Sequence, residues 1–333
     1  MATDRRPWLG SALRWQALAA SLAIGVASTF AVMGLRFDLG LQVGVLLAGI
    51  ILVGFPHGAF DHLVAQPVLA PRLGRFWWLP FGVIYLGLAG LVGIGWTLVA
   101  PLTLVLFLAA SVLHFGLGDL EDSPAPAPVR RWMTVLTYGA LPILLPIAFH
   151  PAEAAPVLAA IGGIAEPTML RALSGAMGLV PLWGACLVWV WHGAGQQQSH
   201  IVMTAVTAAG FVLLPPLIAF GLYFGLVHSP RHLLRLAAWH DPRDVRRAGW
   251  WAARIVVPAS LVSAAGIAGL AWTGPEMSSG LLVPTFRIIA GLTLPHMLVT
   301  GWLDHDKGRL SERAAAQPGR NVTVRADEPA SGP

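Results

Sequence analysis

The sequence has little charge and almost no cysteine. Charged residues make up only 11% of the 333 residues, against about a quarter in a typical soluble domain, whereas 56% are apolar. This composition excludes an ordinary soluble globular protein and predicts a chain built for lipid. The single cysteine, Cys186, excludes an internal disulfide framework and is expected to be a small buried side chain.

Long apolar runs recur along the whole chain. A bilayer core of about 30 Å needs roughly 20 apolar residues per helix. Ten segments meet this requirement: 16–35, 40–64, 77–99, 101–119, 132–149, 172–192, 200–214, 216–236, 251–272 and 282–302. The joints at Pro101 and Pro215 are very short, so the number of separate spans is eight to ten. The sequence therefore predicts an all-α, polytopic transmembrane helix bundle. Among the connections, 150–171 is one of the few long ones.

The distribution of basic residues predicts how the bundle is oriented. With the amino terminus in the cytoplasm, 13 basic residues before position 304 and five after it fall on the inner side, which is 18 of 21. This bias predicts an even number of spans, both termini in the cytoplasm, and a multi-pass protein of the cell's inner membrane. The net charge of +5 thus reflects topology, and no nucleic-acid partner is expected.

Three parts are expected along the chain. Residues 1–15 form a cytoplasmic segment, 16–303 a single transmembrane domain, and 304–333 a polar cytoplasmic tail whose composition is typical of disorder. The apolar run from residue 16 is too long for a signal peptide and is followed by charged residues instead of a small-residue cleavage site.

Five of the eleven histidines are expected at one depth in the membrane. His57, His114, His228, His232 and His296 lie on four predicted helices that run in the same direction, about 18–26 Å from the outer ends at about 1.5 Å per residue. Ionisable residues inside membrane spans are costly and usually mark a functional site. Each histidine alone could simply bond a neighbouring helix, but the shared depth favours one site.

The same histidines have features of metal ligands. His228 and His232, in HSPRH, are four residues apart, so both rings project from one helical face. Asp61 and Asp119, shortly after His57 and His114, are candidates to hold the second ring nitrogen of a metal-bound imidazole; the alternative is a water-facing charge at a helix end. Imidazole suits zinc, copper, iron and nickel. With neither an HExxH motif nor a cysteine pair, a zinc protease site is disfavoured, and four neutral nitrogens suit iron that binds dioxygen.

Four motifs carry a family resemblance: GFPHGAFDH, LHFGLGD, VHSPRH and LPHMLV, in this order on hydrophobic helices. Over most of residues 40–302 the sequence resembles the Brp/Blh family of membrane β-carotene dioxygenases. The resemblance implies oxidative cleavage of the central double bond of β-carotene by O2, giving two retinal molecules at a non-haem Fe(II). Carried over by motif, the catalytic ligands are His57, His114, His228 and His232. His296 is a fifth candidate, either a ligand or a residue that shapes the cavity.

The expected substrate partner is β-carotene drawn from the lipid membrane, and a retinal-binding rhodopsin is a candidate acceptor of the product. A hydrocarbon offers no polar handle, so a tunnel must select the bond by its shape. Tyr223 is the favoured lining residue among Tyr85, Tyr138 and Tyr223, with ordinary packing as the alternative. Arg287 could meet a polar group in the bundle, but snorkelling to the outer interface is favoured. His200 could reach the metal, but a place in a polar joint between helices is favoured.

Two other functions fit parts of the pattern. A membrane iron desaturase or hydroxylase would need a larger set of histidines in HxxxH and HxxHH clusters, whereas this chain has one HxxxH and otherwise dispersed histidines. A transporter with a histidine and aspartate relay would place polar residues at several depths. Here they concentrate in one layer, which favours the oxygenase.

Overall fold

A computed structural model describes residues 7–120, 128–193, 198–273 and 279–316. Within these ranges every regular element is a helix and no strand occurs, so the all-α prediction is confirmed. The elements are α1 (Leu9–Val32), α2 (Leu39–Gly49), η1 (Ile50–Gly54), α3 (Phe55–Gly58), α4 (Asp61–Leu73), η2 (Gly74–Phe76), α5 (Trp78–Leu98), α6 (Ala100–Leu120), α7 (Pro128–Phe149), α8 (Pro151–Gly162), α9 (Glu166–Leu173), η3 (Ala176–Leu179), α10 (Val180–Gly193), α11 (Gln198–Leu213), α12 (Pro216–Leu222), η4 (Tyr223–His228), α13 (Ser229–His240), α14 (Val245–Thr273) and α15 (Ser279–Ala316).

Eight helical stretches of the described chain are long and apolar enough to cross a membrane. The first of them is Leu9–Val32 and the last is Gly280–Gly301. Their number agrees with the lower bound of the predicted eight to ten spans. The predicted span 216–236 is not among the eight, because its histidines, arginines and prolines lower the hydropathy of an otherwise apolar helix. So many apolar helices make the chain a polytopic membrane protein.

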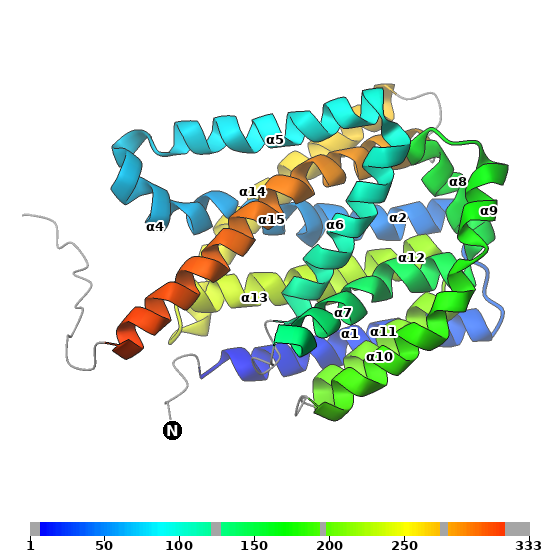
Figure 1. Ribbon diagram of the computed structural model, residues 1–333, viewed down its shortest axis with the longest axis horizontal. Coiled ribbons are helices and arrows are strands. Elements are labelled where there is room, and N and C mark those ends of the chain that lie inside the picture. The colour runs from blue at the N-terminus through cyan, green and yellow to red at the C-terminus, as the bar shows by residue number, and fades with distance from the viewer. Residues whose placement is uncertain (1–6, 121–127, 194–197, 274–278, 317–333) are drawn as a thin grey trace, which may run out of the picture.

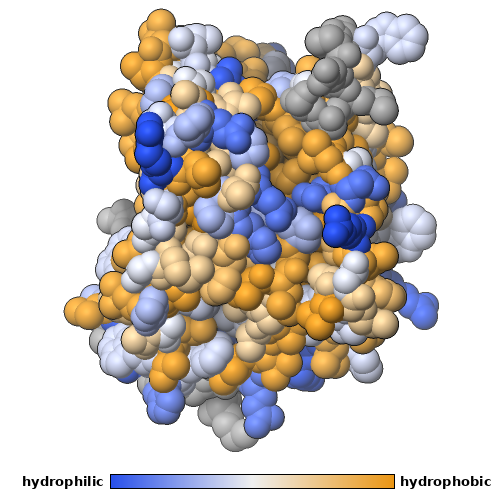
Figure 2. Space-filling model, turned by 90° about the vertical axis from the view of Figure 1, so that its right-hand side faces the viewer, coloured by the Kyte–Doolittle hydropathy of each residue, from blue (hydrophilic) through white to orange (hydrophobic). Residues whose placement is uncertain are grey.

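Most helices run lengthwise through the bundle, whereas α8 and α9 cross its right-hand end (Figure 1). The start of α1 and the end of α15 both lie at the opposite end, which we call the terminal end; the other is the α8 end. Figure 2 views the α8 end, where hydrophilic side chains interrupt a mainly hydrophobic surface. The placement of these ends in the cytoplasm or outside it stays a prediction.

The expected connection 150–171 contains two helices, α8 and α9. A helix of 12 residues is too short to span a bilayer, so a search for runs of roughly 20 apolar residues passes over it. Proline in the first turn of α8 suits the helix start, and Gly163 ends it with a left-handed φ of 63°. At the other end of the chain, α15 stays helical to Ala316, beyond the expected start of the tail at 304; residues 317–333 lie outside the described residues.

Two π-helical segments, η1 and η4, contact each other in the middle of the bundle. The helices that precede the two segments also approach closely and require glycine: a Cβ atom on Gly225 of η4 would lie 2.9 Å from the Cα of Gly49 at the end of α2, and one on Gly221 of α12 would lie 2.9 Å from the Cα of Leu46 of α2. Each segment leads into a histidine, since η1 ends three residues before His57 and η4 ends on His228. Single π-helical turns are frequent at functional sites, and here the close backbone approach brings two histidine-bearing segments together.

Candidate metal centre

Five histidines from four parts of the chain meet inside the bundle. The ring centroid of His57 lies 6.3 Å from that of His114, 5.8 Å from His228, 5.7 Å from His232 and 5.0 Å from His296. These residues come from α3, α6, the end of η4, α13 and α15. The structure therefore brings together all five histidines that the sequence placed at one depth.

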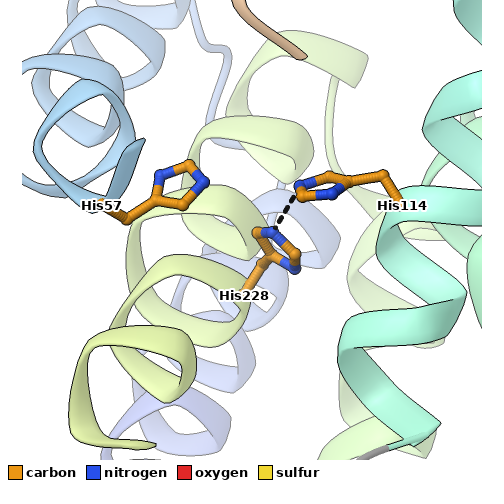
Figure 3. A group of neighbouring side chains, drawn as sticks. All are labelled: His57, His114 and His228. Atoms are coloured by element: carbon orange, nitrogen blue, oxygen red, sulfur yellow. Dashed lines mark hydrogen bonds between the residues drawn. The ribbon is translucent and has the colours of Figure 1, made fainter. Parts of the chain in front are cut away.

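Three of them form the tightest group. One ring nitrogen from each of His57, His114 and His228 lies within 4.8 Å of the other two (Figure 3). The Nε2 atoms of His114 and His228 face each other at 3.0 Å. Metal–nitrogen bonds of about 2.0–2.1 Å to a single ion place neighbouring ligand nitrogens about 3 Å apart. The donor set and its spacing fit a transition-metal ion of the kind that imidazole binds.

A backbone carbonyl, and not a carboxylate, fixes the ring of His57. Its Nδ1 atom contacts the carbonyl oxygen of Gly54, the last residue of η1. When Nδ1 donates its hydrogen to that oxygen, Nε2 carries the free lone pair that a metal requires. The expectation that Asp61 would hold the ring of His57 is corrected by this geometry, because Nδ1 of His57 contacts the Gly54 carbonyl and the carboxylate of Asp61 contacts His296.

Asp61 instead holds His296, 235 positions away. The Nδ1 atom of His296 lies 2.8 Å from Oδ1 of Asp61, and the hydroxyl of Tyr85 donates to Oδ2 at 2.7 Å. Both members of the aspartate–histidine pair are buried, with 3% and 4% of their surfaces exposed. A buried carboxylate is tolerated when donors satisfy both oxygens. This arrangement leaves Nε2 of His296 free as an acceptor, as a metal ligand requires.

Sequence reasoning missed the role of Tyr85, although a signal was present. Gly74, with a φ of 67°, ends the turn between α4 and α5. Asp61 lies 13 residues before this glycine and Tyr85 lies 11 residues after it. In an antiparallel helix pair, residues at nearly equal distances from the turn lie at nearly equal heights. The hairpin therefore pairs a tyrosine with the buried carboxylate.

A cavity leads from the histidines toward the α8 end of the bundle, and with the open space at its mouth it holds about 1320 Å³. Its lining is almost entirely aliphatic and aromatic, and it ends on the rings of His57, His114 and His296. Tyr85 lines it, whereas Tyr223, the expected lining residue, does not. Tyr223 is packed behind Phe115, with ring centroids 5.4 Å apart, and only 2% of its surface is exposed.

A second, polar cavity of about 540 Å³ meets the histidines from the other side. His114 and His296 line both cavities, and Asp119, Arg235 and Thr300 line only the second. Arg235 donates to the carbonyl of Gly118 at 2.9 Å. Among the described residues, Asp119 accepts no hydrogen bond from a histidine. Its predicted role as the partner of His114 is therefore not supported by a hydrogen bond. The histidine layer thus separates an apolar chamber from a polar one.

Two further polar residues have defined contacts. The guanidinium of Arg287 donates to the carbonyl of Ile161 at 2.8 and 3.3 Å and lies over the ring of Trp96, so it meets a polar group of the bundle. His200 is not part of a polar joint but is buried in α11, with its ring 5.1 Å from that of Tyr138.

Comparisons with known proteins point to one family. The family model described as beta-carotene 15,15'-dioxygenase matches residues 48–304. The chain is 30% identical to the probable beta-carotene 15,15'-dioxygenase Blh of Halobacterium salinarum, over 87% of this chain and 92% of that protein. It is 27% identical to the probable enzyme Brp of the same species, over 91% and 93%. The beta-carotene 15,15'-dioxygenase of an uncultured marine bacterium is 25% identical, over 77% and 92%. No solved structure matches the chain.

Proposed function

The chain belongs to the β-carotene 15,15'-dioxygenase family of enzymes, and on that premise we propose that it cleaves the central double bond of β-carotene with O2 to give two retinal molecules. The proposed centre is an Fe(II) ion held by histidines inside the membrane. The observation that carries the proposal is the apolar cavity that ends on histidine rings. A site for a hydrocarbon needs such a lining, and a site for oxygen chemistry needs ligands at its end.

The residues proposed to hold the metal are the five clustered histidines. His57, His114 and His228 are nearest to one another, and His232 and His296 lie against His57. When bound, iron supplies the activation of dioxygen. The protein fixes the tautomer and the orientation of the histidine rings. The Gly54 carbonyl holds the ring of His57, and Asp61, which accepts a hydrogen bond from Tyr85, holds the ring of His296.

The apolar walls have two functions in this proposal. They bind a substrate that has no hydrogen-bonding group, and they keep water from the reacting carbons. Phe224 lines the cavity and stacks its ring on His228, with centroids 5.8 Å apart, so the wall also fixes a ligand ring. We place the enzyme in the inner membrane of the cell, where β-carotene enters from the bilayer. A retinal-binding rhodopsin in the same membrane is the acceptor that the proposal implies.

The test is expression in a bacterium engineered to accumulate β-carotene, followed by extraction and chromatography of the pigments. The wild-type chain should bleach the cells and produce retinal, and the purified protein should contain iron. His114→Ala should lose both activity and iron. His62→Ala is the control, because His62 belongs to the His57 motif but is exposed and, among the residues that the structure describes, contacts the Ala59 carbonyl. Persisting colour without retinal in the wild type, with iron and O2 supplied, contradicts the proposal.

A further inference from the structure

The short helix α8 lines the far end of the apolar cavity with one apolar face and, beside it, the exposed Glu153. Ala154, Val157, Leu158 and Ile161 line the cavity and are spaced by three, one and three residues, so they lie on one side of the helix. We call these four residues the α8 face. Because α8 crosses the end of the bundle (Figure 1) and contacts α6 and α15, which carry His114 and His296, this face lies across the path of a molecule that extends from the histidines toward that end.

The distance from the histidines to this end can be read along two helices. On α6, Leu104 lines the far part of the cavity and His114 the near end, ten residues apart. On α15, Phe286 and His296 are also ten residues apart. At 1.5 Å per residue, both intervals are about 15 Å. β-Carotene is about as long as the hydrocarbon core of a bilayer, about 30 Å, so the cavity is about as long as half of the molecule.

The α8 face is held at a fixed distance from the metal centre. Arg287 of α15 donates two hydrogen bonds to the carbonyl of Ile161, near the end of α8. At Gly162, an added Cβ atom would lie 2.8 Å from Cδ2 of Leu104 on α6, so α8 and α6 are in close contact there. The helices that hold the end of the cavity are therefore two of those that carry the histidines.

We propose that the α8 face is the specificity determinant that stops one ring of the carotenoid half a molecule away from the histidines, so that the central double bond lies beside the centre. This inference rests on the proposed function. One stop is enough, because β-carotene is symmetric about the bond that is cleaved. At the histidine end Gly58 lines the cavity, and an added Cβ atom there would meet no atom within 4 Å, so the wall is open at this point.

The experiment uses a carotenoid with a ring at one end only, such as a long β-apocarotenal, so that the length of the ring-bearing product reports how deeply the ring enters. Leu158→Ala deepens the end of the cavity and should yield a ring-bearing aldehyde one conjugated double bond longer than retinal. Its ratio to retinal should rise by about tenfold, the selectivity that a change of this size in an apolar pocket gives. Ala154→Phe fills the end and should yield a shorter ring-bearing product. Ala160→Phe is the matched control, since Ala160 is on the exposed side of α8, and its product should remain retinal.

The outcomes separate the two proposals. If the wild type cleaves β-carotene centrally but Leu158→Ala and Ala154→Phe still release only retinal, the α8 face is not the stop and the proposed function stands. If the wild type cleaves nothing, the proposed function fails and this inference fails with it. If Ala154→Phe is not recovered as folded protein by gel filtration in detergent, Leu158→Ala alone decides, because it removes atoms and needs no new space.

Discussion

Nδ1 of His296 and Oδ1 of Asp61 lie 2.8 Å apart in the interior of the bundle. The contact joins α15 to α4, and Tyr85 of α5 extends it by donating to the other carboxylate oxygen. A histidine whose Nδ1 hydrogen is held by a carboxylate has a fixed ring and a more basic Nε2 atom. His296, which the sequence marked only as a fifth candidate, thus has the surroundings of a metal ligand.

Replacing Asp61 by asparagine should weaken metal binding. The amide is uncharged and can present its NH2 group to His296, so the ring loses the carboxylate that fixes it. Loss of such a partner typically lowers metal affinity by about 10–100-fold. Iron retained against a competing chelator measures this effect. Asp119→Asn is the comparison, since Asp119 accepts no hydrogen bond from a histidine among the described residues; an equal loss in both variants would contradict a specific role for Asp61.

Tyr85→Phe should destabilise the protein and lower metal affinity less than Asp61→Asn does. The variant removes one donor from a buried carboxylate, and a hydrogen bond to a charged group contributes about 1.5–3 kcal/mol. Thermal unfolding in detergent measures the loss. Tyr223→Phe is the control, because the buried hydroxyl of Tyr223 has no hydrogen-bond partner among the described residues. A control that is as damaging as Tyr85→Phe would mean that the hydroxyl of Tyr85 is not the cause.

The depth of the histidines in the bundle could be predicted from the sequence, whereas the side chains that hold them could not. Depth along a helix depends only on a rise of about 1.5 Å per residue, so the common layer of His57, His114, His228 and His296 could be predicted without a structure. The partner of a side chain depends on which other helices pack against it, and here α15, far away in the sequence, brings His296 to Asp61, while the turn at Ala59 and Phe60 separates α3 from α4. Asp61 therefore meets His296 instead of His57, four residues before it. Tyr223 similarly lies in η4 and packs behind Phe115, away from the cavity.

The end of the cavity was not predictable from hydropathy. A helix of 12 residues cannot span the bilayer, so the sequence of α8 was interpreted as part of the connection 150–171. Only the crossing of α8 over the end of the bundle gives its apolar face a role. The same limitation applied to Arg287, whose partner is a backbone carbonyl 126 residues away.

Gly225→Ala should displace η4 from the end of α2, where η1 begins. The new Cβ atom would lie 2.9 Å from the Cα of Gly49, and a backbone atom cannot move aside as a flexible side chain can. We expect a loss of about 1–3 kcal/mol, typical of overpacking, together with weaker iron binding, because η1 leads into His57 and η4 ends on His228. Gly87→Ala is the control in an exposed helix, where no atom lies within 4 Å of the added Cβ. Its unfolding temperature should stay the same or rise; wild-type stability in Gly225→Ala would contradict the close contact.

The polar cavity should admit water-soluble reagents that the apolar cavity excludes. In a Cys186→Ser background, which removes the single native thiol, Thr300→Cys should react with a charged thiol reagent. Leu108→Cys, which lines the apolar cavity, should react only with an uncharged, lipid-soluble reagent. Mass spectrometry of the labelled protein measures both. Equal labelling of the two positions by the charged reagent would show that the histidine layer does not separate the chambers.

Arg287→Leu should allow cleavage at more than one double bond and lower the free energy of unfolding of the protein. The leucine keeps much of the apolar bulk but removes both donors to the Ile161 carbonyl and the contact with Trp96, so the end of α8 loses its attachment to α15. Loss of a charge-assisted hydrogen bond of this kind costs about 1.5–3 kcal/mol. Since the variant changes no residue of the α8 face, we expect retinal to remain the main product, accompanied by longer and shorter ring-bearing aldehydes in the one-ring assay.

Arg287→Lys distinguishes attachment from charge. Lysine keeps the positive charge but cannot present two donors in a fixed plane, so it should hold the Ile161 carbonyl less firmly and give a product mixture between those of the wild type and Arg287→Leu. If both variants release retinal alone while losing stability, Arg287 supports the fold without setting the depth of the cavity. If Arg287→Lys is as selective as the wild type, a single donor is enough to hold α8 at its distance from His296.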